Sequence, residues 1–255
     1  MLKIIIASIF LGVLLIACGT DEPQVVVPDN KSSIEKRMDS IANEINRARE
    51  LQEKTQLAEA LMIAEAMLKR YPGQLDALTI KAEILKAQGK VNESIAVLEK
   101  AYALQPRDKE LAYDLAYAYA DAKNPKALSL TDTLLKRDKT ETVARAWYSK
   151  ATYYKNLGNT TETLRYLDST TVADFNFLDA YLDKGEIFYT QKKYETALKI
   201  FATGQKLSPA TADFYFWVAK CQEAMGNKTD AKNNYDRAFI LDKTMTEAKE
   251  ASERL

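Results

Sequence analysis

The sequence contains no histidine. This absence excludes imidazole as a general base, as a partner of a nucleophilic Ser or Cys, and as a zinc ligand. Glycine is scarce as well, with 8 residues, and no phosphate-binding loop of the GxxxxGK type occurs. Carboxylate pairs such as Asp108 with Glu110 could serve a glycosidase, but exposed helix faces commonly carry such charges. We therefore expect no enzyme activity, no catalytic residue, no metal site and no cofactor.

The charges are balanced, with 36 basic and 36 acidic residues. No basic stripe or interleaved basic and aromatic cluster is present, so we expect no nucleic-acid partner. Only two cysteines occur, Cys18 and Cys221. We expect Cys221 to pack as a small hydrophobic residue.

The amino terminus has the pattern of an export signal. Lys3 precedes an apolar run of about 14 residues, from Ile4 to Ala17, which is too short to span a bilayer comfortably. The segment Leu15-Ile16-Ala17-Cys18 resembles the lipobox of bacterial lipoproteins. The resemblance implies that residues 1–17 are a lipoprotein signal peptide and that Cys18 carries a lipid anchor holding the protein on a membrane. An ordinary secretory peptide and an uncleaved anchor helix are the alternatives.

The residues after Cys18 bear on localisation. Gly19 stands where an Asp would resemble an inner-membrane retention signal, and Asp21-Glu22 resembles weakly the acidic signal of surface lipoproteins. We therefore expect a cell-envelope protein, an outer-membrane lipoprotein that is periplasm-facing or surface-exposed.

A polar segment containing Pro23 and Pro28 follows, and residues 18–33 are expected to form a flexible tether. Ser32 and Glu35 then have the spacing of a capping box. Apolar residues three or four apart, from Ile34 to Leu51, predict a helix of about 20 residues. This helix is either the first arm of the following array or a coiled-coil dimer arm, and the sequence leaves the oligomeric state open.

A pattern recurs about every 34 residues along the rest of the chain. Gly89, Gly158 and Gly226 mark one point of the repeat, and Pro106 and Pro209 mark another. The spacing of small, bulky and turn residues resembles that of the tetratricopeptide repeat family. We place the repeats at 41–74, 75–108, 109–143, 144–177, 178–211 and 212–245, followed by a C-terminal cap at 246–255.

The resemblance implies an all-α fold, a right-handed superhelical solenoid of about six helical hairpins spanning residues 34–255. In each hairpin a first helix, helix A, packs against a second, helix B. A small residue is expected where helix A approaches its partner. These small residues are Ala82, Ala116, Ala151, Gly185 and Ala219. The glycine turn is expected to adopt the left-handed conformation.

The third repeat departs from the pattern. Asn124-Pro125 occupies the place of the glycine turn, Ala127 falls one position early, and a Lys- and Thr-rich connection lengthens the unit to 35 residues. We expect a local irregularity here and not a missing repeat.

The family resemblance also implies that certain helix A positions line a concave groove that binds another protein or a peptide segment. These positions carry Thr79, Glu83, Lys86, Tyr113, Tyr117, Arg145, Tyr148, Thr152, Lys155, Leu182, Asp183, Glu186, Tyr189, Asp213, Phe216, Trp217, Lys220 and Glu223. Aromatic side chains are common anchors in interfaces.

Two alternatives apply to these aromatic residues. Tyr113 and Tyr148 are equally well explained by packing between helices. Phe216 and Trp217 either form an anchor in the last repeat or pack under the terminal segment from Met245 to Leu255. The Asn and Lys set that clamps a terminal carboxylate in some family members is absent, which disfavours a co-chaperone of that type.

The sequence therefore favours a non-catalytic, membrane-anchored adaptor or scaffold lipoprotein that mediates protein–protein interaction. A pilotin-like lipoprotein, which assists assembly of a secretin, a type IV pilus or another outer-membrane complex, is one alternative. A scaffold for peptidoglycan enzymes is another, and a carbohydrate-capture lipoprotein is a contrasting class. The fold resemblance alone does not select among them.

Overall fold

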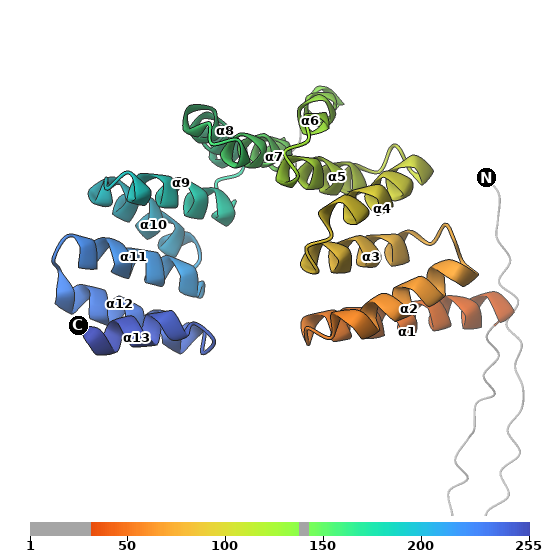
Figure 1. Cartoon of the computed structure of the whole chain (residues 1–255), viewed down its shortest axis with the longest axis horizontal. Coiled ribbons are helices and arrows are strands. Elements are labelled where there is room, and N and C mark those ends of the chain that lie inside the picture. The colour runs from red at the N-terminus through yellow and green to blue at the C-terminus, as the bar shows by residue number, and fades with distance from the viewer. Residues whose placement is uncertain (1–31, 138–142) are drawn as a thin grey trace, which may run out of the picture. The chain divides into compact units, whose positions relative to one another are not determined.

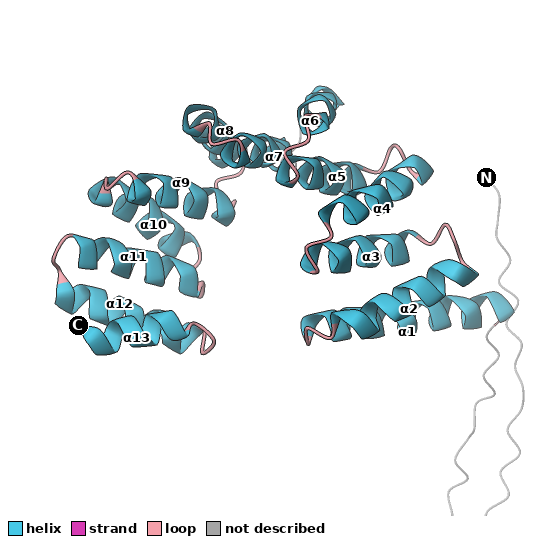
Figure 2. Ribbon diagram, in the orientation of Figure 1, coloured by secondary structure: helices cyan, strands magenta, loops and turns pink. Residues whose placement is uncertain are grey.

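The computed structural model describes residues 32–137 and 143–255, and within these ranges it consists of 13 α-helices and no strands (Figures 1 and 2). The predicted signal peptide, Cys18 and residues 18–31 of the predicted tether lie outside the described residues. The helices are α1 (Ser33–Glu53), α2 (Leu57–Arg70), α3 (Leu75–Ala87), α4 (Val91–Leu104), α5 (Lys109–Asp121), α6 (Lys126–Arg137), α7 (Val143–Asn156), α8 (Thr160–Ala173), α9 (Leu178–Thr190), α10 (Tyr194–Leu207), α11 (Ala212–Ala224), α12 (Lys228–Leu241) and α13 (Thr246–Arg254).

A membrane-crossing helix is not found in the part of the chain that the structure describes.

Helix α1 begins with the predicted capping box. The Ser32 backbone N–H donates to Glu35 Oε2 at 2.6 Å, and the Glu35 backbone N–H donates to Ser32 Oγ at 3.2 Å. Two amide groups of the first turn, which have no partner within the helix, are thereby satisfied.

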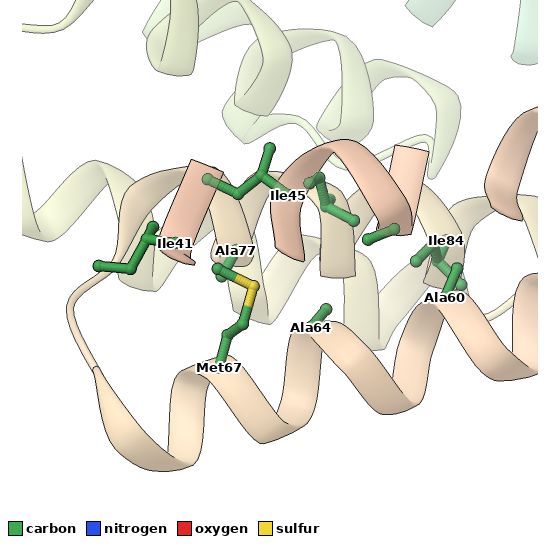
Figure 3. Close-up of a cluster of buried hydrophobic side chains, with 9 residues drawn as sticks. Ile41, Ile45, Ala60, Ala64, Met67, Ala77 and Ile84 are labelled. Carbon is green, nitrogen blue, oxygen red and sulfur yellow. The ribbon is translucent and has the colours of Figure 1, made fainter. Parts of the chain in front are cut away.

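The apolar stripe of α1 packs into the array from Ile41 onward. Ile41, Ile45 and Ala48 are buried in a cluster with Met67 of α2 and Ile84 of α3 (Figure 3). This part of the stripe therefore belongs to the first arm of the array and is not available for a coiled coil, whereas Met38 is exposed.

The turns between paired helices share one backbone conformation. Among the described residues, six have a positive φ: Thr55 (59°), Gly89 (74°), Lys123 (57°), Gly158 (74°), Lys192 (61°) and Gly226 (86°). They are 34 residues apart, except that Lys123 and Gly158 are 35 apart. The left-handed conformation predicted for the three glycines is confirmed, and three non-glycine residues adopt it as well.

A hydrogen bond closes each of these turns. The residue after the left-handed one donates its backbone N–H to the carbonyl five residues earlier, as from Lys90 to Leu85 at 2.8 Å and from Lys193 to Phe188 at 2.9 Å. This bond defines the Schellman motif, which satisfies carbonyl groups at the end of a helix. The Schellman motif ends the first helix of each hairpin, so it fixes the length of the repeat together with the packed core.

Small residues permit the expected close packing of helices. Ala82, Ala116, Ala151 and Ala219 are each 0% exposed. Gly185 of α9 lies against the ring of Phe201 in α10, and a Cβ at this position would overlap the ring. The prediction of a small residue at this point of the repeat is confirmed.

Helices α5 and α6 are both present, so the third repeat is irregular and not missing. Its helix α5 packs directly along α7 (Figure 1). Asn156 of α7 donates its side-chain amide to the carbonyls of Ala120 and Asp121 at 3.3 and 3.2 Å. Ala116 of α5 and Ala146 of α7 are buried in one cluster, which allows this close approach. The observed fold is an all-α helical-repeat solenoid, as predicted.

Candidate protein-binding pocket

A pocket of about 300 Å³ opens on the helix A side of the second to fourth repeats. Its walls come from α3, α4, α5, α7 and the residues around the start of α9. Seven of the residues predicted for the groove line it, namely Thr79, Glu83, Lys86, Tyr113, Tyr117, Arg145 and Tyr148. The pocket is therefore the place where the structure brings the predicted side chains together.

A series of rings crosses this pocket. The Tyr117 and Tyr148 rings stack with centroids 6.1 Å apart and planes 7° apart. Phe177 continues the series, with its ring centroid 4.8 Å from that of Tyr148. We call Tyr117, Tyr148 and Phe177 the ring series. All three are half-buried, so they present apolar surface and are also held by their neighbours.

The ring series is bounded by charged groups. Lys86 Nζ lies 4.4 Å from the centroid of the Tyr117 ring, a cation–π contact. The Tyr148 hydroxyl donates to Asp183 Oδ2 at 3.2 Å, and Asp183 also forms an ion pair with Lys155. Burial raises the pKa of Tyr148, and the nearby Asp183 carboxylate raises it further. Tyr148 therefore remains a neutral donor, and its ring has a fixed orientation.

Arg145 links two repeats at the edge of the pocket. Its guanidinium forms ion pairs with Glu110 and, at 2.7 Å, with Asp114 of α5. It also lies 5.1 Å from the centroid of the Tyr113 ring. Burial raises the pKa of Asp114, although Arg145 acts in the opposite direction.

Four of the predicted groove residues are buried and present little surface to a partner. Tyr113 is 1% exposed, Thr152 is 7% exposed, and Asp183 and Phe216 are each 8% exposed. Tyr113 forms part of the pocket wall, but the packing alternative accounts for its position. Phe216 packs with Tyr235 and with Ala248 and Ala251 of α13, so it belongs to the core under the terminal helix.

Trp217 is half-buried and also packs. Its ring stacks on Phe201 with centroids 5.4 Å apart and planes 12° apart, and it meets the Tyr189 ring edge-on at 5.4 Å. Lys220 Nζ lies 4.9 Å from the Trp217 ring centroid. Leu182 packs against the same cluster of α9, α10 and α11. Trp217 thus packs among α9, α10 and α11, and it also lies against the cluster under α13.

Three further predicted residues line a separate pocket of about 400 Å³ next to the C-terminal helix. Tyr189, Lys220 and Glu223 lie on one side, and Glu250 and Arg254 of α13 lie on another. Arg254 pairs with Glu223 at 2.7 Å. This pocket is more polar than the first and has no ring series.

The sequence did not indicate Phe177 or Asp179 as pocket residues. Phe177 directly precedes α9, at the end of a repeat, where the family pattern assigns no groove contact. A second ring cluster was also missed: Trp147 and Tyr154 of α7 stack on either side of Tyr166 of α8, with centroids 5.9 and 5.5 Å apart. The seven-residue spacing of Trp147 and Tyr154 on one helix was the available signal.

No group of three or more Cys, Asp or Glu side chains in residues 32–137 and 143–255 could hold a metal ion. Cys221 is buried among apolar residues, and burial raises its pKa to about 12, so the thiolate is strongly disfavoured at neutral pH. The pocket itself is lined by rings and charged groups that suit noncovalent contacts.

Comparison with solved structures shows the same fold. A tetratricopeptide repeat protein from Parabacteroides merdae aligns with a TM-score of 0.65 and 19% identity over 83% of this chain and 82% of that chain. PilW, a widely conserved type IV pilus biogenesis factor, aligns with a TM-score of 0.59 and 17% identity over 82% and 94% of the two chains.

Sequence relatives match shorter segments. Human superkiller complex protein 3 is 27% identical over 150 residues, which are 58% of this chain and 10% of that protein. The bovine SGT1 homolog is 38% identical over 68 residues, which are 27% of this chain and 20% of that protein. This chain thus spans a tenth to a fifth of the length of these curated relatives.

The model of the tetratricopeptide repeat family matches residues 45–109 and 81–127. The periodic turns, the small residues between helices and the likeness to solved repeat proteins extend the same description to the later hairpins. Repeats of this kind imply a scaffold for protein–protein interaction. The matched residues identify tetratricopeptide repeats in this chain, and the later hairpins have the same fold.

Proposed function

We propose that this protein is a membrane-anchored adaptor that holds a protein partner in the pocket of the ring series and performs no chemistry. The supporting observation is the arrangement of Tyr117, Tyr148 and Phe177, which are half-buried and stacked between charged side chains. Interfaces concentrate binding energy in such aromatic residues, surrounded by a polar rim.

The pocket is also pre-organised. Tyr148 is held by its hydrogen bond to Asp183, and Tyr117 is covered on one side by Lys86. A partner therefore does not have to immobilise these rings on binding, which lowers the entropic cost of association. An apolar side chain of the partner would lie against the rings, and its backbone would meet the charged rim.

The anchor is the second part of this proposal. Lipid on Cys18 would hold the array at the outer membrane, and bacterial lipoproteins carry several acyl chains, which is enough for stable attachment. An extended tether of about 14 residues reaches roughly 45 Å at about 3.3 Å per residue. The adaptor would thus present its pocket at a distance from the lipid surface, on the periplasmic or the outer side.

Photocrosslinking in cells tests the docking role. A photoreactive residue in place of Lys86, at the pocket rim, should trap a defined partner, whereas one in place of Lys100, exposed on helix B of the same repeat, should not. The Tyr148→Ala change should abolish the Lys86 crosslink. Identical products from both positions would contradict a role for this pocket.

A pilotin-like role is the second candidate, and the likeness to PilW over 94% of that chain favours it. In this version the adaptor assists assembly of a pilus or secretin complex in the outer membrane. Loss of secretin multimers after deletion of the gene, with restoration by the wild-type chain but not by the Tyr148→Ala chain, would support it. Unchanged multimers would leave only the general adaptor role.

A further inference from the structure

The helix A faces of α9 and α11 carry an acidic patch beside the ring series. We define the acidic patch as Asp179 and Glu186 of α9 and Asp213 of α11. Asp179 also lines the pocket, so the acidic patch adjoins the ring series through this residue.

The cations nearby are engaged elsewhere. Lys155 pairs with Asp183, and Lys220 lies 3.6 Å from Glu247 and over the rings of Phe216 and Trp217. Among the residues that the structure describes, none forms a hydrogen bond or an ion pair with the carboxylates of the acidic patch. The negative charge of this surface is thus left for a partner to neutralise.

The carboxylates also act on one another. Burial raises the pKa of Asp179, and the carboxylates of Asp183 and Asp213 raise it further. Burial likewise raises the pKa of Glu186. Lys155 and Lys220 oppose this rise, and Asp183 and Asp213 add to it. Carboxylates that raise one another's pKa repel each other, and a cation bound between them would relieve this repulsion.

The geometry restricts which cation fits. Within the described residues no three acidic side chains converge closely enough to bind a metal ion. Carboxylates spread over two helices are suited instead to several cationic groups at similar spacing, which the side chains of a lysine- or arginine-rich peptide provide.

Building on the docking role proposed above, we propose that the partner segment is basic, with an apolar or aromatic residue in the pocket of the ring series and lysine or arginine side chains against the acidic patch. The ring series supplies the anchor, and the acidic patch selects the charge of the segment. A segment rich in glutamate would be repelled, which adds specificity.

Fluorescence anisotropy with the full chain and three labelled peptides tests this inference. The first peptide has one phenylalanine followed by three lysines, the second has glutamates in place of the lysines, and the third has serine in place of the phenylalanine. The lysine peptide should bind at least about tenfold more tightly than the glutamate peptide, since three exposed charge pairs together contribute about this factor. Its affinity should fall as salt rises from 50 to about 300 mM.

Matched variants assign the effect to the acidic patch. The triple change Asp179→Asn, Glu186→Gln and Asp213→Asn should weaken binding of the lysine peptide about tenfold. A control chain with the same change in net charge carries Glu93→Gln, Glu195→Gln and Asp230→Asn, which are exposed first-turn residues of helices B, and it should bind as the wild type does.

The outcomes separate the two proposals. Equal binding of the lysine and glutamate peptides, lost on Tyr148→Ala, would overturn the charge inference and leave the docking role intact. Equal weakening in both triple variants would overturn the assignment to the acidic patch. Failure of all three peptides to bind would overturn the inference, whereas the crosslinking experiment would still decide the docking role.

Discussion

Gly185 of α9 lies so close to the ring of Phe201 in α10 that a Cβ on this glycine would come under 3.0 Å from three ring atoms. The same relationship recurs between Gly204 of α10 and Phe214 of α11. In both pairs the ring of one helix occupies the space that a side chain on the preceding helix would fill. These two contacts join α9, α10 and α11 in a single core cluster.

The Gly185→Ala change should therefore destabilise the protein. In an unobstructed helix alanine is more favourable than glycine by about 1 kcal/mol, but overpacking costs typically 1–3 kcal/mol. We expect a net loss of about 1 kcal/mol in urea unfolding. The double change Gly185→Ala and Phe201→Leu should relieve the overlap and recover part of this loss. A more stable Gly185→Ala chain would contradict the close approach.

The left-handed turns give a second stability prediction. Lys192 has a φ of 61°, a region that favours glycine, so Lys192→Gly should stabilise the protein by up to about 1 kcal/mol. Gly89→Ala should cost about 1 kcal/mol, and no atom lies within 4 Å of an added Cβ there, so only the backbone is tested. Lys199→Gly, in the exposed interior of α10, is the control and should destabilise. Melting temperatures of the three variants test this prediction, and a Lys192→Gly chain that is less stable than the wild type would contradict it.

These turns also show how far the sequence predicts the fold. Gly89, Gly158 and Gly226 were sufficient to set the period, because glycine is the residue that most readily takes a positive φ. Thr55, Lys123 and Lys192 adopt the same conformation without a local signal, because the helices on both sides fix the turn. The 35-residue spacing around the third repeat was visible in the sequence, whereas the direct packing of α5 on α7 was not.

The site was predicted less well than the fold. Lys86, Tyr117 and Tyr148, which were chosen by their family positions, line one pocket. The same positions placed Phe216 in the groove, although the terminal helix α13 covers it. A pattern of one repeat carries no information about the cap that follows the last repeat. Phe177 was missed for a similar reason, since it lies between repeats.

The changes Phe216→Ala and Tyr117→Ala should distinguish an aromatic residue of the core from one that serves binding. Removing a buried Phe side chain costs about 3–5 kcal/mol, so Phe216→Ala should lower the unfolding free energy strongly. Tyr117→Ala removes a half-buried ring of the ring series and should cost less stability while abolishing binding of the phenylalanine-lysine peptide. Thermal unfolding and anisotropy measured on the same samples distinguish the two effects. Equal destabilisation by both changes would mean that the ring series is core.

Cys18→Ser tests the proposed lipid anchor. The thiol of residue 18 is the expected attachment point, and serine cannot replace it in that reaction. In bacterial cells the wild-type chain should fractionate with the outer membrane, and the Cys18→Ser chain should be lost from it. Cys221→Ser is the control, because Cys221 is buried, and it should leave fractionation unchanged. Membrane retention of the Cys18→Ser chain would contradict the lipoprotein assignment.

The acidic patch should cost stability in the absence of a partner, and the pH dependence of that cost has a definite sign. Burial raises the pKa of Glu186 above its value of about 4.3 in an unfolded chain, so the folded protein binds this proton more tightly than the unfolded one. The penalty is therefore absent below about pH 4, grows as the pH rises through the interval between the two pKa values, and is complete above the pKa of the folded state. Glu186→Gln removes the charge and should raise Tm at pH 7 while weakening binding of the lysine peptide, as sites that serve binding often reduce stability.

Thermal unfolding of the wild-type and Glu186→Gln chains from pH 4 to pH 8 measures this difference. The gain in Tm should shrink as the pH falls, because the wild-type carboxyl then becomes neutral as well. Glu50→Gln, at an exposed position of α1, is the matched control for loss of one negative charge. If both variants change Tm equally at every pH, the effect comes from net charge and not from the burial and crowding of carboxylates beside the ring series. A gain confined to Glu186→Gln, and abolished when the lysine peptide saturates the wild-type chain, would tie the cost to the cation that the surface is inferred to receive.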